Sequence, residues 1–141
     1  MLEYRIGNGK DFIDIGYARR SDEDKKKQIQ SIPRQKNWLR DQEKKWRIKL
    51  TKVWVDIKTA KAPGRPEFND MIDFIYQADK PVRIWAWRLS RLSRNPIDEG
   101  TIKYLVTTGK IANVIVDGKI YDSQTNQILW GVDFGEATQK S

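Results

Sequence analysis

The chain has 141 residues and a mass of 16.6 kDa, which is the size of one ordinary domain with room for a buried core. It contains neither Cys nor His, so zinc fingers, disulfide scaffolds, thiol nucleophiles and His-based catalytic dyads are excluded. A Mg²⁺ or Ca²⁺ site built from carboxylates alone survives this exclusion. The net charge of +8 favours a polyanionic partner, and nucleic acid is the first candidate.

No feature of the sequence indicates a membrane protein. No apolar run approaches the ~20 residues of a membrane-spanning helix. Charged residues interrupt the first segment, MLEYRIGNGKDF, so it does not have the apolar stretch of a signal peptide. We therefore expect a soluble, cytoplasmic protein.

In the first half of the chain, apolar and polar stretches alternate at the lengths of strands, helices and loops. Ser31 and Pro33 suit the start of a helix, and Ile32, Leu39 and Trp46 mark one face of it. The predicted elements are a loose lead-in (residues 1–10), a strand (12–18), a polar loop (19–30), a helix (31–46), a second strand (50–56) and a loop (57–64).

The second half begins with the clearest helix, which Pro66 opens and whose apolar residues recur at intervals of three and four. In the helix after Pro96, we expect Ile97, Tyr104 and Leu105 to share one apolar face. Asp117-Gly118 predicts a tight turn between two strands. The predicted elements are a helix (66–79), a strand (82–87), a basic loop (88–95), a helix (96–109), strands (111–116 and 119–121) and a last helix from Ile128.

This order of elements predicts a three-layer α/β/α domain with a sheet of about five strands. The strands joined by helices should be parallel, and the last strand should be antiparallel because a tight turn precedes it. We find no internal linker, so residues 11–141 form one predicted domain. A helix still running near residue 141 leads us to expect a piece of a longer protein.

Polar residues follow three of the predicted strands, where ligands bind in open α/β sheets. The first strand leads to Arg19 and Ser21, the second to Asp56 and the loop before Arg65, and the third to a series of arginines. A guanidinium matches two phosphate oxygens and keeps its charge. Several arginines around a serine are therefore a credible metal-free site for attack on a phosphodiester, with a phosphoserine as the covalent intermediate.

Four motifs in this order resemble the catalytic domain of the serine recombinases, the resolvase/invertase family, and most of all the large serine integrases. Together they extend over residues 11–141. The motifs are residues 16–21 (GYARRS) with the glutamines of 30–35 (QSIPRQ), residues 64–71 (GRPEFNDM), residues 88–95 (RLSRLSRN) and residues 133–137 (DFGEA).

The resemblance implies a site-specific recombinase that cuts and rejoins double-stranded DNA through a 5′-phosphoserine, without metal, ATP or another cofactor. It implies that Ser21 is the nucleophile and that homodimers assemble into tetramers on DNA. A separate DNA-binding region, absent from this chain, would follow the last helix. The resemblance also assigns a phosphate-binding role to Arg19, Arg65, Arg91 and Arg94, an acidic site position to Asp56, and supporting positions to Gln30, Gln35 and Ser90.

One departure from the family motif gives an alternative. Ser90 stands where the family has Asp, and a serine cannot neutralise a neighbouring arginine. The alternative is therefore a catalytically impaired module that docks on DNA or assembles there, and a generic basic DNA-binding domain is a third hypothesis. For single residues, Ser21 could be a loop residue, Asp56 could cap a strand or pair with Lys58, and the two glutamines could be ordinary helix residues.

Overall fold

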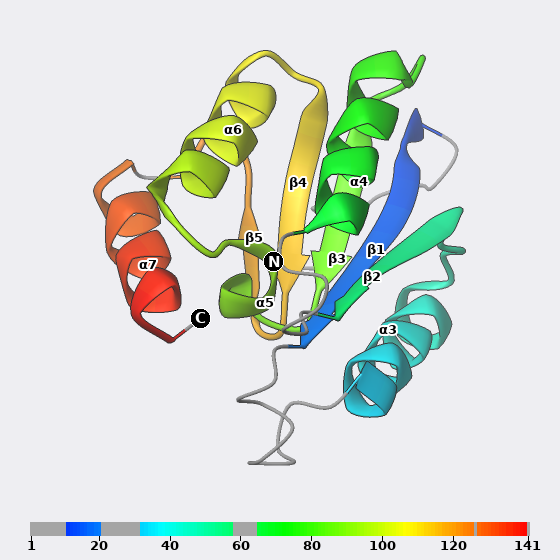
Figure 1. Cartoon of the computed structure of the whole chain (residues 1–141). Helices are drawn as coiled ribbons and strands as arrows, with labels where there is room; N and C mark the ends of the chain where they lie inside the picture. The colour runs from blue at the N-terminus through cyan, green and yellow to red at the C-terminus, as the bar shows by residue number, and fades with distance from the viewer. Residues whose placement is uncertain (1–10, 21–31, 58–64, 126, 141) are drawn as a thin grey trace.

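A computed structural model describes residues 11–20, 32–57, 65–125 and 127–140 of the chain (Figure 1). The predicted lead-in and most of the two predicted loops before residue 65 lie outside these ranges. The elements are β1 (Ile13–Arg20), α3 (Ile32–Trp46), β2 (Lys52–Ile57), α4 (Pro66–Gln77), β3 (Val82–Ala86), α5 (Leu89–Leu92), α6 (Pro96–Thr107), β4 (Ile111–Val116), β5 (Lys119–Tyr121) and α7 (Gln127–Lys140).

The five strands form one sheet in the order β2-β1-β3-β4-β5. β1 pairs in parallel with β2 and β3, and β3 pairs in parallel with β4. β5 is antiparallel to β4, and Gly118 in the turn between them takes a φ of +83°, which glycine adopts without a steric penalty. The predicted mostly parallel sheet with an antiparallel last strand is confirmed.

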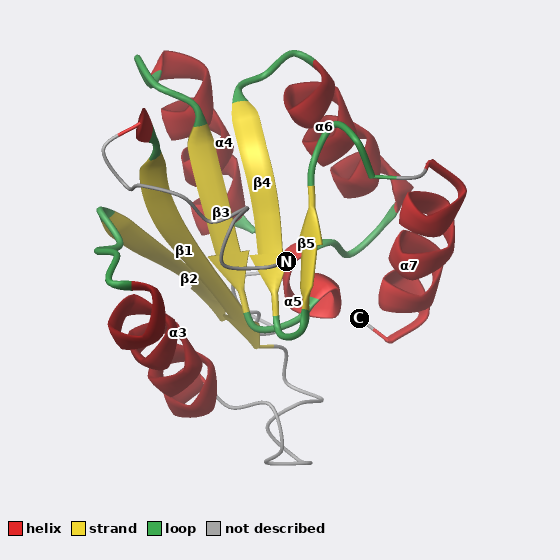
Figure 2. Ribbon diagram, turned by 180° about the vertical axis from the view of Figure 1, so that it is seen from behind, coloured by secondary structure: helices red, strands yellow, loops and turns green. Residues whose placement is uncertain are grey.

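The sheet separates two apolar layers (Figures 1 and 2). The larger layer lies between the sheet and helices α4, α6 and α7, and it includes Ile15, Ile84 and Met71. The smaller layer lies on the α3 side, where Leu39 and Trp85 are buried. Successive strand residues point to opposite faces, which places the odd-numbered residues of β1 in the larger layer and leaves Asp14 and Gly16 facing α3.

Two local predictions near the carboxyl ends of the strands are corrected. β1 extends to Arg20 rather than ending near Ala18, because Arg19 and Arg20 continue the pairing with Asp56 and Ile57 of β2. The predicted basic loop 88–95 contains the one-turn helix α5. Within it, the backbone N–H of Ser93 donates to the carbonyl of Leu89 at 2.9 Å.

The apolar face predicted for α6 is buried only at Leu105. Ile97 is 79% exposed and Tyr104 is 60% exposed, whereas Ile102, Leu105 and Val106 are buried. The side of the helix that carries Ile102, Leu105 and Val106 packs into the larger apolar layer. In the described part of the chain, no helix has both the length and the apolar character needed to cross a bilayer.

Candidate functional site

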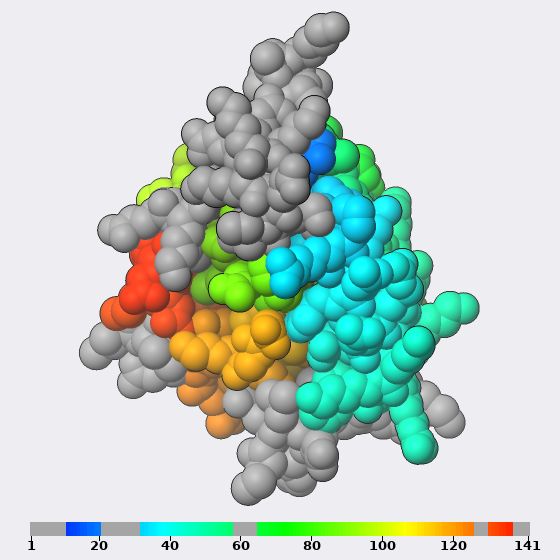
Figure 3. All heavy atoms as spheres, turned by 90° about the horizontal axis from the view of Figure 1, so that it is seen from below, coloured from blue at the N-terminus to red at the C-terminus, as the bar shows by residue number. Residues whose placement is uncertain are grey.

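The arginines that follow the strands meet at one edge of the sheet. Arg19 is near the end of β1, Arg91 lies in α5 directly after β3, and Arg65 precedes α4. Figure 3 views the molecule from this side, with α5 between α3 and α7. Ser21, the predicted nucleophile, follows the last residue of β1, and both Ser21 and Gln30 lie outside the described residues.

Arg19 is fixed at both its backbone and its side chain. The backbone N–H of Arg19 donates to Gln35 Oε1 at 3.1 Å, and Gln35 Nε2 donates to the Arg19 carbonyl at 2.8 Å. Through this reciprocal pair, α3 holds the end of β1. The guanidinium donates from Nε to the carbonyl of Arg91 at 3.3 Å and from Nη2 to the carbonyl of Ser90 at 2.6 Å. Gln35 therefore supports the position of Arg19.

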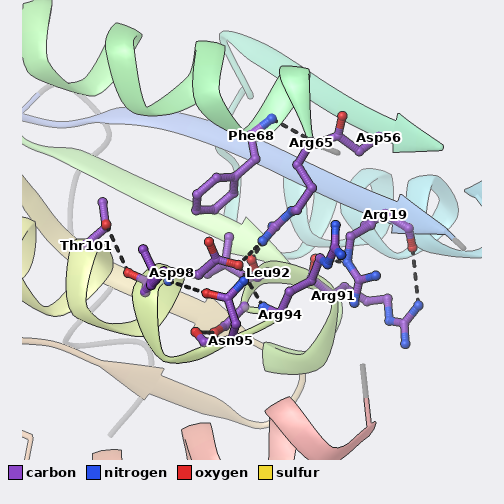
Figure 4. A network of polar contacts seen from close by, with 12 residues as sticks. Arg19, Asp56, Arg65, Phe68, Arg91, Leu92, Arg94, Asn95, Asp98 and Thr101 are labelled. Carbon is purple, nitrogen blue, oxygen red and sulfur yellow. Dashed lines mark hydrogen bonds and ion pairs between the residues drawn. The ribbon is translucent and has the colours of Figure 1, made fainter. Parts of the chain in front are cut away.

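The same contacts bring α5 against β1. Arg91 is 1% exposed, and its Nη1 lies 3.5 Å from the carbonyl oxygen of Arg19. Arg94 comes just after α5, and its backbone N–H donates to Asp98 Oδ2 at 2.9 Å. Figure 4 shows Arg19, Arg91 and Arg94 grouped beside Arg65. The structure therefore brings the four predicted arginines together; we call Arg19, Arg65, Arg91 and Arg94 the arginine cluster.

Asp56 of β2 caps α4 from outside the helix. Its Oδ1 accepts a hydrogen bond from the Glu67 N–H at 3.0 Å, and its Oδ2 accepts one from the Phe68 N–H at 2.9 Å. These are N–H groups of the first turn, which have no partner within a helix. Asp56 Oδ2 also accepts a hydrogen bond from the Tyr17 hydroxyl at 2.6 Å. Asp56 thus fixes the start of α4, next to Arg65.

Arg65 points inward and has partners on three elements. Its Nε donates to the Tyr17 hydroxyl at 3.2 Å, its Nη2 donates to the Leu92 carbonyl, and its Nη1 donates to Asp98. The Phe68 ring lies 3.9 Å from the guanidinium carbon. Only 8% of Arg65 is exposed, so these partners set the orientation of its guanidinium.

Sequence reasoning missed Tyr17 and Asp98 as members of the site. Tyr17 belongs to the strand and to the motif of residues 16–21 but is given no role there, although its hydroxyl joins Asp56 to Arg65. Asp98 had a readable local signal, because Asn95 followed three residues later by an acid is typical of a capped helix start. Asn95 Oδ1 indeed accepts a hydrogen bond from the Asp98 N–H at 2.9 Å. The contact of Asp98 with Arg65 depends on a tertiary arrangement that no local motif encodes.

The cluster produces a positive potential at this edge. Burial, together with the charges of Arg91, Arg65 and Arg94, lowers the pKa of Arg19 to about 10. Arg19 stays protonated at neutral pH, at a cost that a bound anion would relieve. Burial, together with Asp56, raises the pKa of Tyr17 despite the opposing charge of Arg65, so its hydroxyl remains a donor.

Ser90 lies beside the cluster and lines a separate cavity. Its carbonyl accepts from Arg19, and the residue lines a cavity of about 350 Å³ with Tyr121, Asp133 and Glu136. Asp133 accepts hydrogen bonds from the Tyr121 hydroxyl at 2.6 Å and from Lys119 Nζ at 2.9 Å. Burial opposes its ionisation, but these two donors outweigh it and hold the pKa of Asp133 below its usual range.

This geometry suits a tetrahedral anion. Guanidiniums from β1, from the residue before α4 and from α5 lie near enough to act on one another electrostatically, and a group of guanidiniums can bind several phosphate oxygens. Among the described residues, no group of three or more Asp or Glu side chains is placed to hold a metal ion.

The family model of the resolvase N-terminal domain matches residues 14–132. The chain belongs to the resolvase family. Apart from Ile13 at the start of β1, the matched range of this resolvase-family domain contains the described elements from β1 to β5. Among curated proteins, none matches the sequence.

Solved structures share the fold of this resolvase-family domain. The N-terminal catalytic domain of TP901-1 integrase is 19% identical, with a TM-score of 0.61 over 92% of this chain and 95% of that chain. A resolvase family site-specific recombinase from Streptococcus pneumoniae is 22% identical, with a TM-score of 0.65 over 91% and 87% of the two chains. The C-terminal catalytic domain of ISC1926 TnpA, an IS607-like serine recombinase, is 21% identical, with a TM-score of 0.56 over 75% and 70%.

Proposed function

We propose that this resolvase-family domain is the catalytic domain of a site-specific DNA recombinase that works through a covalent 5′-phosphoserine. The observation that carries the proposal is the arginine cluster, which gathers at the edge where β1 leads toward Ser21. Its substrate would be double-stranded DNA, bound by a homodimer that assembles into a tetramer. Membership of the resolvase family supports the proposal.

In the proposed reaction, Ser21 Oγ attacks the phosphorus of a DNA phosphodiester and loses its proton. A bond forms between Oγ and phosphorus, and the bond from phosphorus to the 3′ oxygen breaks. That oxygen takes up a proton and leaves as a 3′-hydroxyl. Rejoining reverses these steps with the 3′-hydroxyl of another strand, so the phosphoserine ester conserves the bond energy and no ATP is consumed.

The described residues have separate parts in this proposal. Arg19, Arg91 and Arg94 bind the non-bridging phosphate oxygens, on which charge increases during in-line displacement. Arg65 does the same from the side of α4. Asp56 and Gln35 are positioning residues, because Asp56 caps the helix after Arg65 and Gln35 holds the Arg19 backbone. Gln30 belongs to the proposal by its place in the motif.

The proposal is tested by trapping the covalent intermediate. The chain is joined to a DNA-binding region of known target and incubated with a DNA site that carries a nick, so that cleavage cannot be reversed. We expect a protein–DNA adduct that resists denaturant and that is lost in Ser21→Ala. Ser123→Ala, on a different loop, is the matched control and should keep the adduct. An adduct that persists in Ser21→Ala would refute the assignment of the nucleophile.

A second candidate function is that of a catalytically impaired module that docks on DNA or assembles there. The observation that favours it is Ser90, which contributes a backbone carbonyl to Arg19 and no charge. If this alternative holds, the native sequence forms no adduct, and Ser90→Asp gains one. Adduct formation by the native sequence would exclude the alternative.

A further inference from the structure

Asp98 lies in the first turn of α6 and contacts the arginine cluster from the side opposite β1 (Figure 4). Its Oδ2 accepts hydrogen bonds from Arg65 Nη1 and from the backbone N–H of Arg94. The side chain of Asp98 is 14% exposed, and that of Arg65 is 7% exposed. Water therefore screens this ion pair much less than it screens a pair on the surface.

The position of Asp98 is itself fixed. The Asp98 N–H donates to Asn95 Oδ1 at 2.9 Å, and the Glu99 N–H donates to the Asn95 carbonyl at 3.1 Å. Pro96 opens the helix, with its φ already suited to the first turn. The carboxylate is therefore held toward Arg65 by the start of α6.

Arg65 has five N–H donors, and several of them already have partners. Nε donates to Tyr17, Nη2 to the Leu92 carbonyl and Nη1 to Asp98. A phosphate oxygen that approaches Nη1 meets the Asp98 carboxylate at the same nitrogen. Two anions so placed repel each other, and each weakens the binding of the other at this guanidinium.

We propose that Asp98 is a positioning residue, the internal counter-ion that occupies Arg65 Nη1 until the phosphate of a DNA strand competes for it. The carboxylate offsets part of the repulsion among the guanidiniums when no anion is bound, and it lowers the affinity of the cluster for phosphate. This inference rests on the proposed function, because that function identifies the competing anion as a phosphodiester.

The experiment measures phosphate affinity in the 141-residue chain. Inorganic phosphate replaces chloride at constant ionic strength, and the dissociation constant is obtained from the rise of the thermal unfolding midpoint. Asp98→Asn keeps an acceptor for the Arg94 N–H and removes only the charge. We expect Asp98→Asn to bind phosphate about fivefold or more tightly than the native chain, and to unfold at a lower temperature when phosphate is absent.

Glu99→Gln is the matched control. Glu99 is the next residue of the same turn, carries the same charge and pairs with Lys103 at 3.7 Å, outside the cluster. We expect Glu99→Gln to leave the phosphate affinity within about twofold of the native value. Asp98→Asn and Glu99→Gln each remove one negative charge, so a difference between them does not come from general attraction to the net charge. Should Asp98→Asn not fold, Asp98→Ser removes the same charge and leaves Asn95 as the cap of α6.

The outcomes separate this inference from the proposed function. If Asp98→Asn binds phosphate no more tightly than Glu99→Gln, while Arg91→Ala still weakens phosphate binding, the role of Asp98 is refuted and the phosphate site remains. If Arg91→Ala leaves the phosphate affinity of the native chain unchanged, phosphate does not bind at the cluster. That result refutes the inference and contradicts the proposed function as well.

Discussion

Tyr17 links a carboxylate and a guanidinium that belong to different elements. Its hydroxyl donates to Asp56 at 2.6 Å and accepts from Arg65 Nε at 3.2 Å. Its ring packs edge-on against Phe68, with the centroids 5.7 Å apart. One buried side chain therefore aligns the end of β2, the start of α4 and an arginine of the cluster.

We predict that Tyr17→Phe lowers the free energy of unfolding by about 1–3 kcal/mol, because it leaves Asp56 and Arg65 each with one buried partner fewer. Urea unfolding of the two proteins measures this difference. Tyr104→Phe makes the same chemical change at a tyrosine that is 60% exposed, and it should change stability by less than about 0.5 kcal/mol. Equal effects at the two positions would contradict the structural role of the Tyr17 hydroxyl.

The raised pKa of Tyr17 predicts that the folded chain loses stability at high pH. Burial raises the pKa of Tyr17 in the folded chain, so above about pH 10 the unfolded chain loses this proton first. The stability that the neutral hydroxyl contributes is complete below that pH and is lost as the pH rises. The native chain should therefore lose stability between pH 9 and pH 11 faster than Tyr17→Phe, on the order of 1 kcal/mol per pH unit at most. Parallel pH profiles would refute this prediction.

A buried ion pair joins β1 and β3 on the α3 side of the sheet. Arg83 Nε and Nη2 each donate to Asp14 at 2.7 Å, and Trp85 Nε1 donates to Asp14 Oδ1 at 2.8 Å. Arg83 is 0% exposed and Asp14 is 4% exposed. The pair satisfies polar groups deep in the sheet, and it favours the observed register because Asp14 lies opposite Arg83 in the ladder.

We predict that Arg83→Met destabilises the chain by about 3–5 kcal/mol, since it leaves the Asp14 carboxylate buried without its cationic partner. Denaturant unfolding measures the loss. Adding Asp14→Asn to Arg83→Met removes the unpaired charge and should restore part of the stability. If the double variant is less stable than Arg83→Met by the full cost of a second independent substitution, the two side chains are not coupled.

Helices, strands and turns could be predicted from the sequence where apolar residues recur at regular intervals and a proline or glycine marks a boundary. Pro66, Pro96 and Asp117-Gly118 stand at the starts of α4 and α6 and in the β4–β5 turn, as expected. The buried face of α6 could not be predicted in this way, because Ile97 and Tyr104 are as apolar as the residues that are buried. α5 was also missed, since one helical turn leaves no periodic signal.

The gathering of the arginines could be predicted from the sequence, but the contacts that hold them could not. Topology alone placed Arg19, Arg65 and Arg91 at one edge, because parallel strands end on the same side. The partners of these arginines are backbone carbonyls, a tyrosine and Asp98. Backbone carbonyls have no residue identity, so no sequence pattern reveals that Arg19 binds the carbonyls of Ser90 and Arg91.

The net charge of the domain favours the proposed binding of DNA. The chain carries 27 Lys and Arg against 19 Asp and Glu, and the arginine cluster lies at the edge that leads toward Ser21. Contacts between basic side chains and phosphates release condensed counterions, so they weaken as salt is added. The cluster and the outer basic residues are expected to contribute to this binding in different ways.

We predict that the 141-residue chain binds duplex DNA weakly and that the logarithm of its affinity falls linearly with the logarithm of the salt concentration. Titrations at several salt concentrations, followed by fluorescence anisotropy of a labelled duplex, give the slope.

Lys45→Gln, at an exposed site near the end of α3, removes one charge far from the cluster. Arg91→Ala removes one charge within it. If the cluster binds the reacting phosphate, Arg91→Ala abolishes cleavage by the fusion described above while the duplex affinity falls no more than about tenfold. If Arg91→Ala and Lys45→Gln lower affinity and cleavage in the same proportion, the cluster contributes only general attraction and has no part in the transition state.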